Sequence, residues 1–141
     1  MSAALYLETS ALLSWLFGEP ASPEVIEALE SYDPVVSSVL SVVETGRALV
    51  RAEAEGIITA GDHKRLQGMF AEYSYGWNYL QVIPSVRQRA AQPFPVEPIR
   101  TLDAIHLASA IELLALYPDL VVLSFDKRIR DNLVPLGLKH A

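Results

Sequence analysis

The sequence contains no cysteine in its 141 residues, which excludes disulfides and thiolate metal sites. This absence suits the reducing environment of the cytoplasm. No stretch reaches the roughly 18 uninterrupted apolar residues that a membrane span needs. No Lys or Arg precedes the first apolar run, which argues against a signal peptide. We therefore expect a cytoplasmic protein that makes no contact with a membrane.

Glycine and positive charge are also scarce. The seven glycines form neither the GxGxxG nor the GxxxxGK[ST] pattern, so the sequence predicts no nucleotide-binding loop. There are 11 Lys and Arg residues against 17 Asp and Glu, and the formal net charge is −6. This balance disfavours generic binding to nucleic acid, because phosphate contacts depend on cationic side chains. Any role on nucleic acid must therefore rest on a local basic patch.

Apolar residues make up 51% of the chain, so it should fold as a globule, and its length suits a single domain over residues 1–141. Short apolar runs alternate with segments of helical pattern. The expected strands are 3–7, 34–38, 78–83 and 120–125, and the expected helices are 10–17, 22–32, 38–55, 59–73, 85–92, 102–117 and 127–133. Such alternation is typical of a parallel sheet covered on both faces. The predicted fold is a three-layer α/β/α sandwich with a central, mainly parallel sheet.

Four acidic residues have positions that suggest a common site. Glu8 in "LYLETSALL" and Asp126 in "LSFDKRI" each follow an apolar strand, whereas Asp103 starts an apolar helix and Glu44 lies in an otherwise uncharged helical run. Ligand sites in parallel sheets gather at the carboxyl ends of the strands. Carboxylates that converge there repel one another, and a hard divalent cation such as Mg²⁺ relieves the repulsion.

Each acid also has an ordinary structural interpretation. Glu8, Asp103 and Asp126 stand where acids cap a helix or complement its dipole. Glu44 precedes Arg47 by three residues and can pair with it on the next turn. Spacing alone leaves both interpretations open.

The segments "LYLETSALL", "SVVETGRAL", "LDAIHLASA" and "VVLSFDKRI" occur in this order. Together they resemble the PIN-domain family, specifically its VapC-type toxin ribonucleases, over nearly the whole chain. "LDAIHLASA" is the most specific of the four. The resemblance implies a PIN-like domain that cleaves single-stranded RNA as a metal-dependent endoribonuclease, the toxin of a type II toxin–antitoxin pair.

By this resemblance the family's four acids fall on Glu8, Glu44, Asp103 and Asp126, which would bind one or two Mg²⁺ or Mn²⁺ ions. The first is Asp in the family and Glu8 here. Glu8 and Asp103 would be direct ligands and Asp126 a direct or water-mediated one. Glu44 would orient the attacking water or help to hold a second ion. Phosphodiester hydrolysis needs an activated water and neutralised charge, which divalent cations supply.

Hydroxyl and cationic side chains near the acids are candidates for substrate binding. Ser10 and Ser124 lie beside acids, and the resemblance implies a hydroxyl at each place, contacting the metal shell or a phosphate. A helix cap is an equal alternative for Ser10. Arg47 and Arg51 share a helical face, and with Lys127 they are candidate contacts to RNA phosphates. The alternative is a solvated face of ordinary ion pairs.

The histidines and aromatic residues are less informative. Imidazole is a poor ligand for Mg²⁺, so we predict that His106 is a buried hydrogen-bonding residue. We place His63 and His140 at the surface. The segment "EYSYGWNYL" favours core and interface packing, with stacking on RNA bases as the alternative.

The resemblance further implies a homodimer and a small antitoxin whose basic or aromatic segment covers the acids. Arginine binds carboxylates bidentately, which suits such a partner. A second function stays open, because Glu8 departs from the family's Asp. The chain would then be a catalytically impaired PIN-like domain that binds RNA or a protein without cleavage. A phosphate-accepting receiver domain is excluded, since the third strand is followed by Pro84 and Ser85 and no acid.

Overall fold

The computed structural model describes residues 2–141, in which five parallel strands form one sheet in the order β3-β2-β1-β4-β5. The strands are β1 (Leu5–Leu7), β2 (Val35–Ser38), β3 (Asn78–Leu80), β4 (Val121–Leu123) and β5 (Lys139–His140). In the register of the central strand, Leu5 is opposite both Val35 and Val121. The chain runs outward from β1 to β3, then returns to place β4 on the other side of β1. The carboxyl ends of β1 and β4 therefore form a topological switch point, where open α/β sheets bind ligands.

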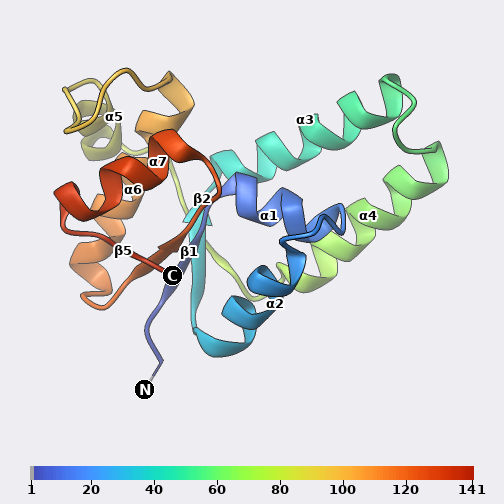
Figure 1. The fold of residues 1–141 in the computed structure, drawn as a ribbon, viewed down its shortest axis with the longest axis horizontal. Helices are drawn as coiled ribbons and strands as arrows, with labels where there is room; N and C mark the ends of the chain where they lie inside the picture. The colour runs from blue at the N-terminus through green and yellow to red at the C-terminus, as the bar shows by residue number, and fades with distance from the viewer. Residues whose placement is uncertain (1) are drawn as a thin grey trace.

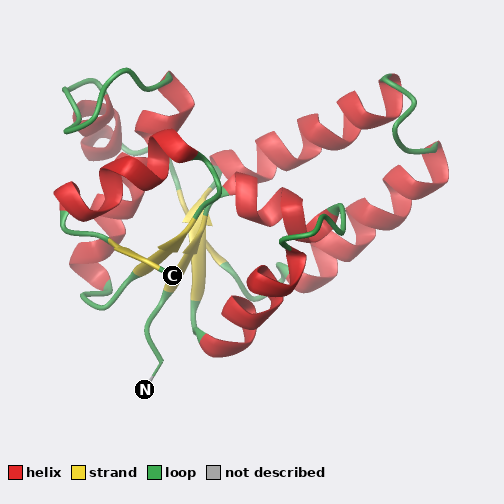
Figure 2. Cartoon of the chain, in the orientation of Figure 1, coloured by secondary structure: helices red, strands yellow, loops and turns green. Residues whose placement is uncertain are grey.

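Helices cover both faces of this sheet (Figures 1 and 2). They are α1 (Thr9–Leu16), α2 (Ser22–Ser31), α3 (Leu40–Ala54), α4 (Ala60–Tyr73), α5 (Pro84–Ala90), α6 (Thr101–Leu116) and α7 (Lys127–Leu133), followed by the 3₁₀ turn η1 (Val134–Leu136). Figure 1 shows the first four helices on one side of the sheet and the last three on the other. The predicted three-layer α/β/α sandwich is confirmed.

The central strand supplies both hydrophobic cores, because successive side chains of a strand point to opposite faces. Leu5 and Leu7 pack with Leu12 and Leu49 on the side of α1 to α4. Tyr6, on the other face, belongs to the core beneath α6 and α7. All three residues of β1 are buried. A strand that is buried on both faces consists of consecutive apolar residues, which is why this strand could be predicted from the sequence.

Local signals place the ends of several helices. Thr59 caps α4 and exchanges hydrogen bonds with Asp62, which together form a capping box. Gly56 follows α3 with a φ of +73°, a conformation that residues with a Cβ rarely adopt. The turn between them lets α3 and α4 form a long antiparallel hairpin that projects from the body of the domain (Figure 1).

The structure differs from the expected elements mainly at the sheet. The strands are shorter than predicted, and the short strand β5 at the edge was not expected. His140, which we placed at the surface, is half-buried in β5, with Nε2 3.2 Å from the carbonyl oxygen of Ser124. His63 is also half-buried, and its Nδ1 lies 2.8 Å from a carboxylate oxygen of Glu53. Both side chains are thus partly exposed, and their contacts could not be predicted because they are made with tertiary neighbours. Among residues 2–141, no helix has the length and apolarity of a membrane span.

Candidate active site

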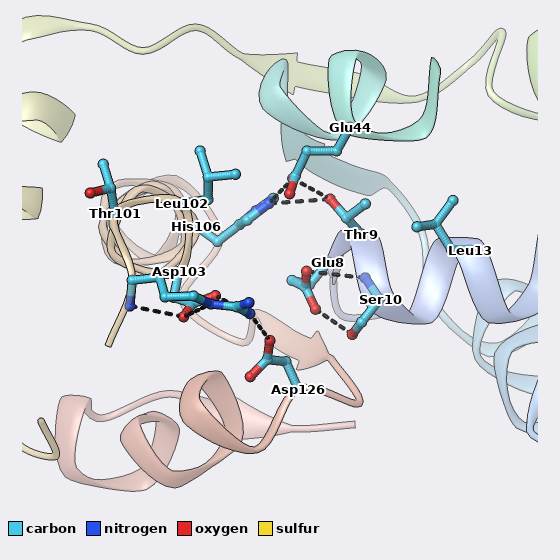
Figure 3. A pocket seen from close by; sticks show the side chains of 11 residues that line it. Glu8, Thr9, Ser10, Leu13, Glu44, Thr101, Leu102, Asp103, His106 and Asp126 are labelled. Atoms are coloured by element: carbon cyan, nitrogen blue, oxygen red, sulfur yellow. Dashed lines mark hydrogen bonds and ion pairs between the residues drawn. The ribbon is translucent and has the colours of Figure 1, made fainter. Parts of the chain in front are cut away.

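A pocket of about 440 Å³ opens beside the carboxyl ends of β1 and β4. All four predicted acids line it, and Figure 3 shows them arriving from separate elements. The complete lining is Glu8, Thr9, Ser10, Leu13, Glu44, Arg100, Thr101, Leu102, Asp103, His106 and Asp126. The fold thus brings together acids that lie up to 118 positions apart in the chain.

Three of these acids lie at the start of a helix, Glu8 and Asp126 as N-caps and Asp103 in the first turn, so they have a structural part as well. Glu8 caps α1 and accepts a hydrogen bond from the backbone N–H of Ser10. Asp126 caps α7 and accepts from the N–H of Arg128. Asp103, in the first turn of α6, accepts from the N–H of Arg100. Capping positions each carboxylate at the pocket, because the helices start at the rim of the sheet where the strands end. The two interpretations therefore describe one arrangement.

The Glu8 carboxylate is buried and held by serine donors. One oxygen accepts from the Ser10 N–H at 3.0 Å, and the other accepts from the hydroxyls of Ser10 and, at 2.6 Å, of Ser124. Each serine oxygen in turn accepts a backbone N–H, from Phe125 at 2.9 Å and from Asp126 at 3.1 Å respectively. A buried carboxylate needs such partners, since an unpaired one carries a large desolvation cost. Ser10 and Ser124 thus join the ends of β1 and β4 around Glu8.

Glu44 ends a chain of hydrogen bonds that starts inside the core. Its Oε1 lies 2.7 Å from the Thr9 hydroxyl and 2.6 Å from Nε2 of His106, whose Nδ1 lies 2.7 Å from the Tyr6 hydroxyl. Burial raises the pKa of Tyr6, so its hydroxyl stays protonated and donates to Nδ1, which leaves the Nε2 hydrogen for Glu44. His106 is buried and hydrogen-bonded, as predicted.

These contacts also set the charge of Glu44. Desolvation by partial burial raises its pKa, but the hydrogen bonds from His106 and from the Thr9 hydroxyl outweigh it. The pKa of Glu44 consequently lies below its ordinary value, and the side chain is ionised at neutral pH. Glu44 pairs with His106, and its alternative pairing with Arg47 does not occur in residues 2–141.

Arg100 is a site residue that the sequence analysis missed. Its Nε lies 3.2 Å from Asp103 Oδ2 and its Nη2 lies 3.0 Å from Asp126 Oδ2, so one guanidinium connects two acids. The contact to Asp103 was detectable, since Arg100 precedes it by three residues. The contact to Asp126 depends on the packing of α6 against α7 and has no local signal. Thr9 was missed as well, because its contact with Glu44 joins α1 to α3 and has no local signal either.

The cationic residues predicted to bind RNA lie outside the pocket. Arg47 and Arg51 are exposed on α3, and Arg51 lines a separate groove with Phe17. Lys127 is exposed and pairs with Asp131. The only cation in the pocket lining is therefore Arg100, within the part of the chain that the structure describes.

The aromatic segment is divided between the core and the surface. Trp77 contacts the rings of Trp15 and Phe70, and Tyr73 contacts Trp15 edge to face. Tyr73 nevertheless remains 59% exposed and Tyr75 92% exposed. The packing interpretation thus holds for Trp77, which joins the core, and not for the two exposed tyrosines.

The donor chemistry of the pocket fits a hard divalent cation. Carboxylate and hydroxyl oxygens surround it, the set that Mg²⁺ and Mn²⁺ prefer. Within residues 2–141, no group of three or more histidine, aspartate or glutamate side chains is close enough to hold an ion. The acids are engaged by the serines, by His106 and by Arg100. Mg²⁺ commonly takes one or two carboxylates and keeps several waters, a mode that this arrangement accommodates.

Comparison with known proteins agrees with the fold. The PIN domain family model matches residues 5–132. The chain is 36% identical to ribonuclease VapC46 of Mycobacterium tuberculosis, covering 96% of this chain and 95% of that protein, and 27% identical to ribonuclease VapC35 of the same species, covering 95% and 93%.

Solved structures share the fold at low sequence identity. VapBC2 from Rickettsia felis, crystallised with a DNA fragment of its promoter, matches with a TM-score of 0.66 and 9% identity over 98% of this chain and 97% of that one. A toxin–antitoxin complex from Klebsiella pneumoniae matches with a TM-score of 0.57 and 18% identity over 89% and 88%. Because the family model spans most of its length and the VapC46 similarity extends nearly end to end, the chain belongs to the PIN domain family, among relatives of the VapC ribonucleases.

Proposed function

We propose that this protein is a metal-dependent endoribonuclease that cleaves single-stranded RNA, and that it is the toxin of a type II toxin–antitoxin pair. The observation that carries the proposal is the position of Glu8, Glu44, Asp103 and Asp126 around one pocket at the switch point of the sheet. The ribonuclease names of its relatives support the same activity.

Each acid has a distinct part in the proposed reaction. Glu8 and Asp103 hold the principal Mg²⁺ or Mn²⁺ ion, and Asp126 holds it directly or through a water. When bound, such an ion neutralises charge on the phosphate and lowers the pKa of water. Glu44 is ionised at neutral pH and held by His106 and Thr9, so it can accept a hydrogen bond from the attacking water and orient it. Alternatively, Glu44 helps to hold a second ion.

The remaining predicted residues have supporting parts. Ser10 and Ser124 fix Glu8. The Ser10 hydroxyl lines the pocket and is the one proposed to contact a phosphate as well, whereas Ser124 is fully buried and supports Glu8 alone. Arg47, Arg51 and Lys127 lie beyond the pocket, so any phosphates that they bind belong to flanking nucleotides. The RNA would therefore extend past the pocket on the exposed surface of the domain.

The proposed partners are a small antitoxin and a second copy of the chain, in the cytoplasm. Two solved structures of the same fold are titled as VapBC or toxin–antitoxin assemblies. The contact of Arg100 with Asp103 and Asp126 supports an arginine of the antitoxin as the group that covers the acids, since a guanidinium already fits there.

A non-cleaving PIN-like domain is the second candidate, and one observation favours it. The Glu8 carboxylate accepts hydrogen bonds from Ser10 and Ser124, which compete with a metal ion for its oxygens. Under this alternative the chain binds RNA or a protein partner and cleaves nothing.

Variants at Glu8 separate the two functions, by Mn²⁺ titration and by cleavage of a single-stranded RNA. Mg²⁺ demands near-octahedral ligands at about 2.0–2.1 Å, and Glu is one methylene longer than Asp. We therefore expect wild type to cleave, Glu8→Asp to raise activity at limiting Mg²⁺, and Glu8→Gln to lower it. Glu19→Gln, which changes an exposed acid outside the pocket, is the matched control. If wild type is inert with both metals and Glu8→Asp restores cleavage, the non-cleaving alternative is correct.

A further inference from the structure

Arg100 occupies both oxygens of Asp103. Its backbone N–H lies 3.0 Å and its Nε 3.2 Å from Oδ2, while Nη2 lies 3.5 Å from Oδ1. The same Nη2 lies 3.0 Å from Oδ2 of Asp126. The side chain of Asp103 is only 6% exposed and that of Asp126 20%. A divalent cation approaching this pair therefore meets oxygens that already face a positive charge.

The Arg100 side chain is itself free to leave. It is 63% exposed, so water can solvate the guanidinium when it moves away from the two carboxylates. Its departure would not release Asp103, because the backbone N–H of Arg100 still holds Oδ2. An arginine guanidinium is charged at any physiological pH, so neutralisation is not a route to its release.

We propose that Arg100 is an internal competitor of the metal ion: its guanidinium acts as the counter-cation of Asp103 and Asp126 and must leave before a divalent cation binds them. This inference rests on the proposed function, because it requires a metal ion at the acidic pocket. Competition of this kind lowers the apparent affinity for the metal ion. The size of the reduction is set by the population ratio between the form in which Arg100 contacts the two acids and the form in which it has moved away. Arg100 thereby sets the concentration of divalent cation at which the site fills.

The test compares Mn²⁺ affinity by isothermal titration calorimetry at fixed ionic strength. Arg100→Gln should bind Mn²⁺ tighter than wild type by roughly two- to thirtyfold, the range expected for two ion pairs made by a largely exposed arginine. Arg100→Lys keeps the charge but not the fork that joins two carboxylates, so its affinity should lie between the two. Arg128→Gln is the matched control, because it removes a neighbouring exposed charge that makes no ion pair in residues 2–141.

Thermal unfolding tests the same competition without an RNA cleavage assay. In EDTA, Arg100→Gln should unfold at a lower temperature than wild type, since Asp103 and Asp126 lose their counter-charge. Saturating Mn²⁺ should remove the difference, because the ion takes that place in both proteins.

Several outcomes overturn the inference, and they are distinguishable. If Arg100→Gln gains no more Mn²⁺ affinity than Arg128→Gln, the gain comes from removing a positive charge near the pocket and not from competition for the acids. If Arg100→Gln binds Mn²⁺ more weakly, Arg100 supports the metal site. If neither wild type nor any variant binds Mn²⁺, the proposed metal site fails and the competition fails with it.

Discussion

Tyr6 shows how a residue of the core can act on the pocket. It lies in the central strand, and its hydroxyl donates to the buried His106, which in turn contacts Glu44. Glu44 is therefore oriented from behind by groups that RNA does not reach. From the sequence, His106 could be predicted as a buried hydrogen-bonding residue, but its two partners could not, since they lie on β1 and α3.

Tyr6→Phe tests this chain of contacts. The change leaves a buried ring nitrogen of His106 without a partner, so the free energy of unfolding should fall by about 1–3 kcal/mol. Urea denaturation measures it. Tyr79→Phe is the control, because the buried Tyr79 hydroxyl has no hydrogen-bond partner within residues 2–141 and its loss should cost less. Equal losses in the two variants would show that the Tyr6–His106 contact contributes nothing specific.

At the scale of the elements, prediction succeeded where the signal is local. The helices expected over 38–55 and 59–73 agree with α3 and α4 to within a residue or two, and Gly56 and the capping box at Thr59 mark their ends locally. Strand β5 was missed because a strand of two residues is too short to show a pattern of apolar and polar residues. Arg47 and Arg51 were correctly placed together on one helix, but the distance of that face from the pocket depends on how α3 lies across the sheet. Helical spacing cannot supply that information.

The exposed arginines of α3 give a prediction about RNA binding. Replacing Arg47 and Arg51 with Ala should weaken binding and flatten its salt dependence by about 0.7 units of log–log slope for each lost phosphate contact. Mn²⁺ affinity should change little, because neither side chain lines the pocket. The double variant Lys64→Ala and Arg65→Ala on α4 controls for lost charge. A slope equal to that of wild type would mean that the arginines of α3 do not contact RNA.

At the scale of the whole molecule, the order of the strands creates the site. Because β1 and β4 are neighbours, residues that follow them, Glu8 and Asp126, meet at one rim. The parallel sheet and the meeting of Glu8 with Asp126 were predictable, since continuous apolar strands and strand-end acids are visible in the sequence. The arrival of Glu44 and Asp103 at the same pocket was expected only from the family resemblance. The bridge from Arg100 to Asp126 was not, because it exists only once α6 and α7 pack together.

The most direct test of the account is cleavage of a single-stranded RNA by wild type and Asp103→Asn, with Mg²⁺ and with EDTA. Asn keeps the shape and one carbonyl oxygen for the Arg100 N–H but removes the ligand charge. Cleavage should therefore fall by roughly 100-fold, about 2.7 kcal/mol in the barrier, while the fold is kept. Asp119→Asn, in an exposed turn outside the pocket, should cleave like wild type, and EDTA should abolish both activities. Cleavage by Asp103→Asn at the wild-type rate with Mg²⁺ would mean that Asp103 is only a helix-capping residue and that the assigned active site is wrong.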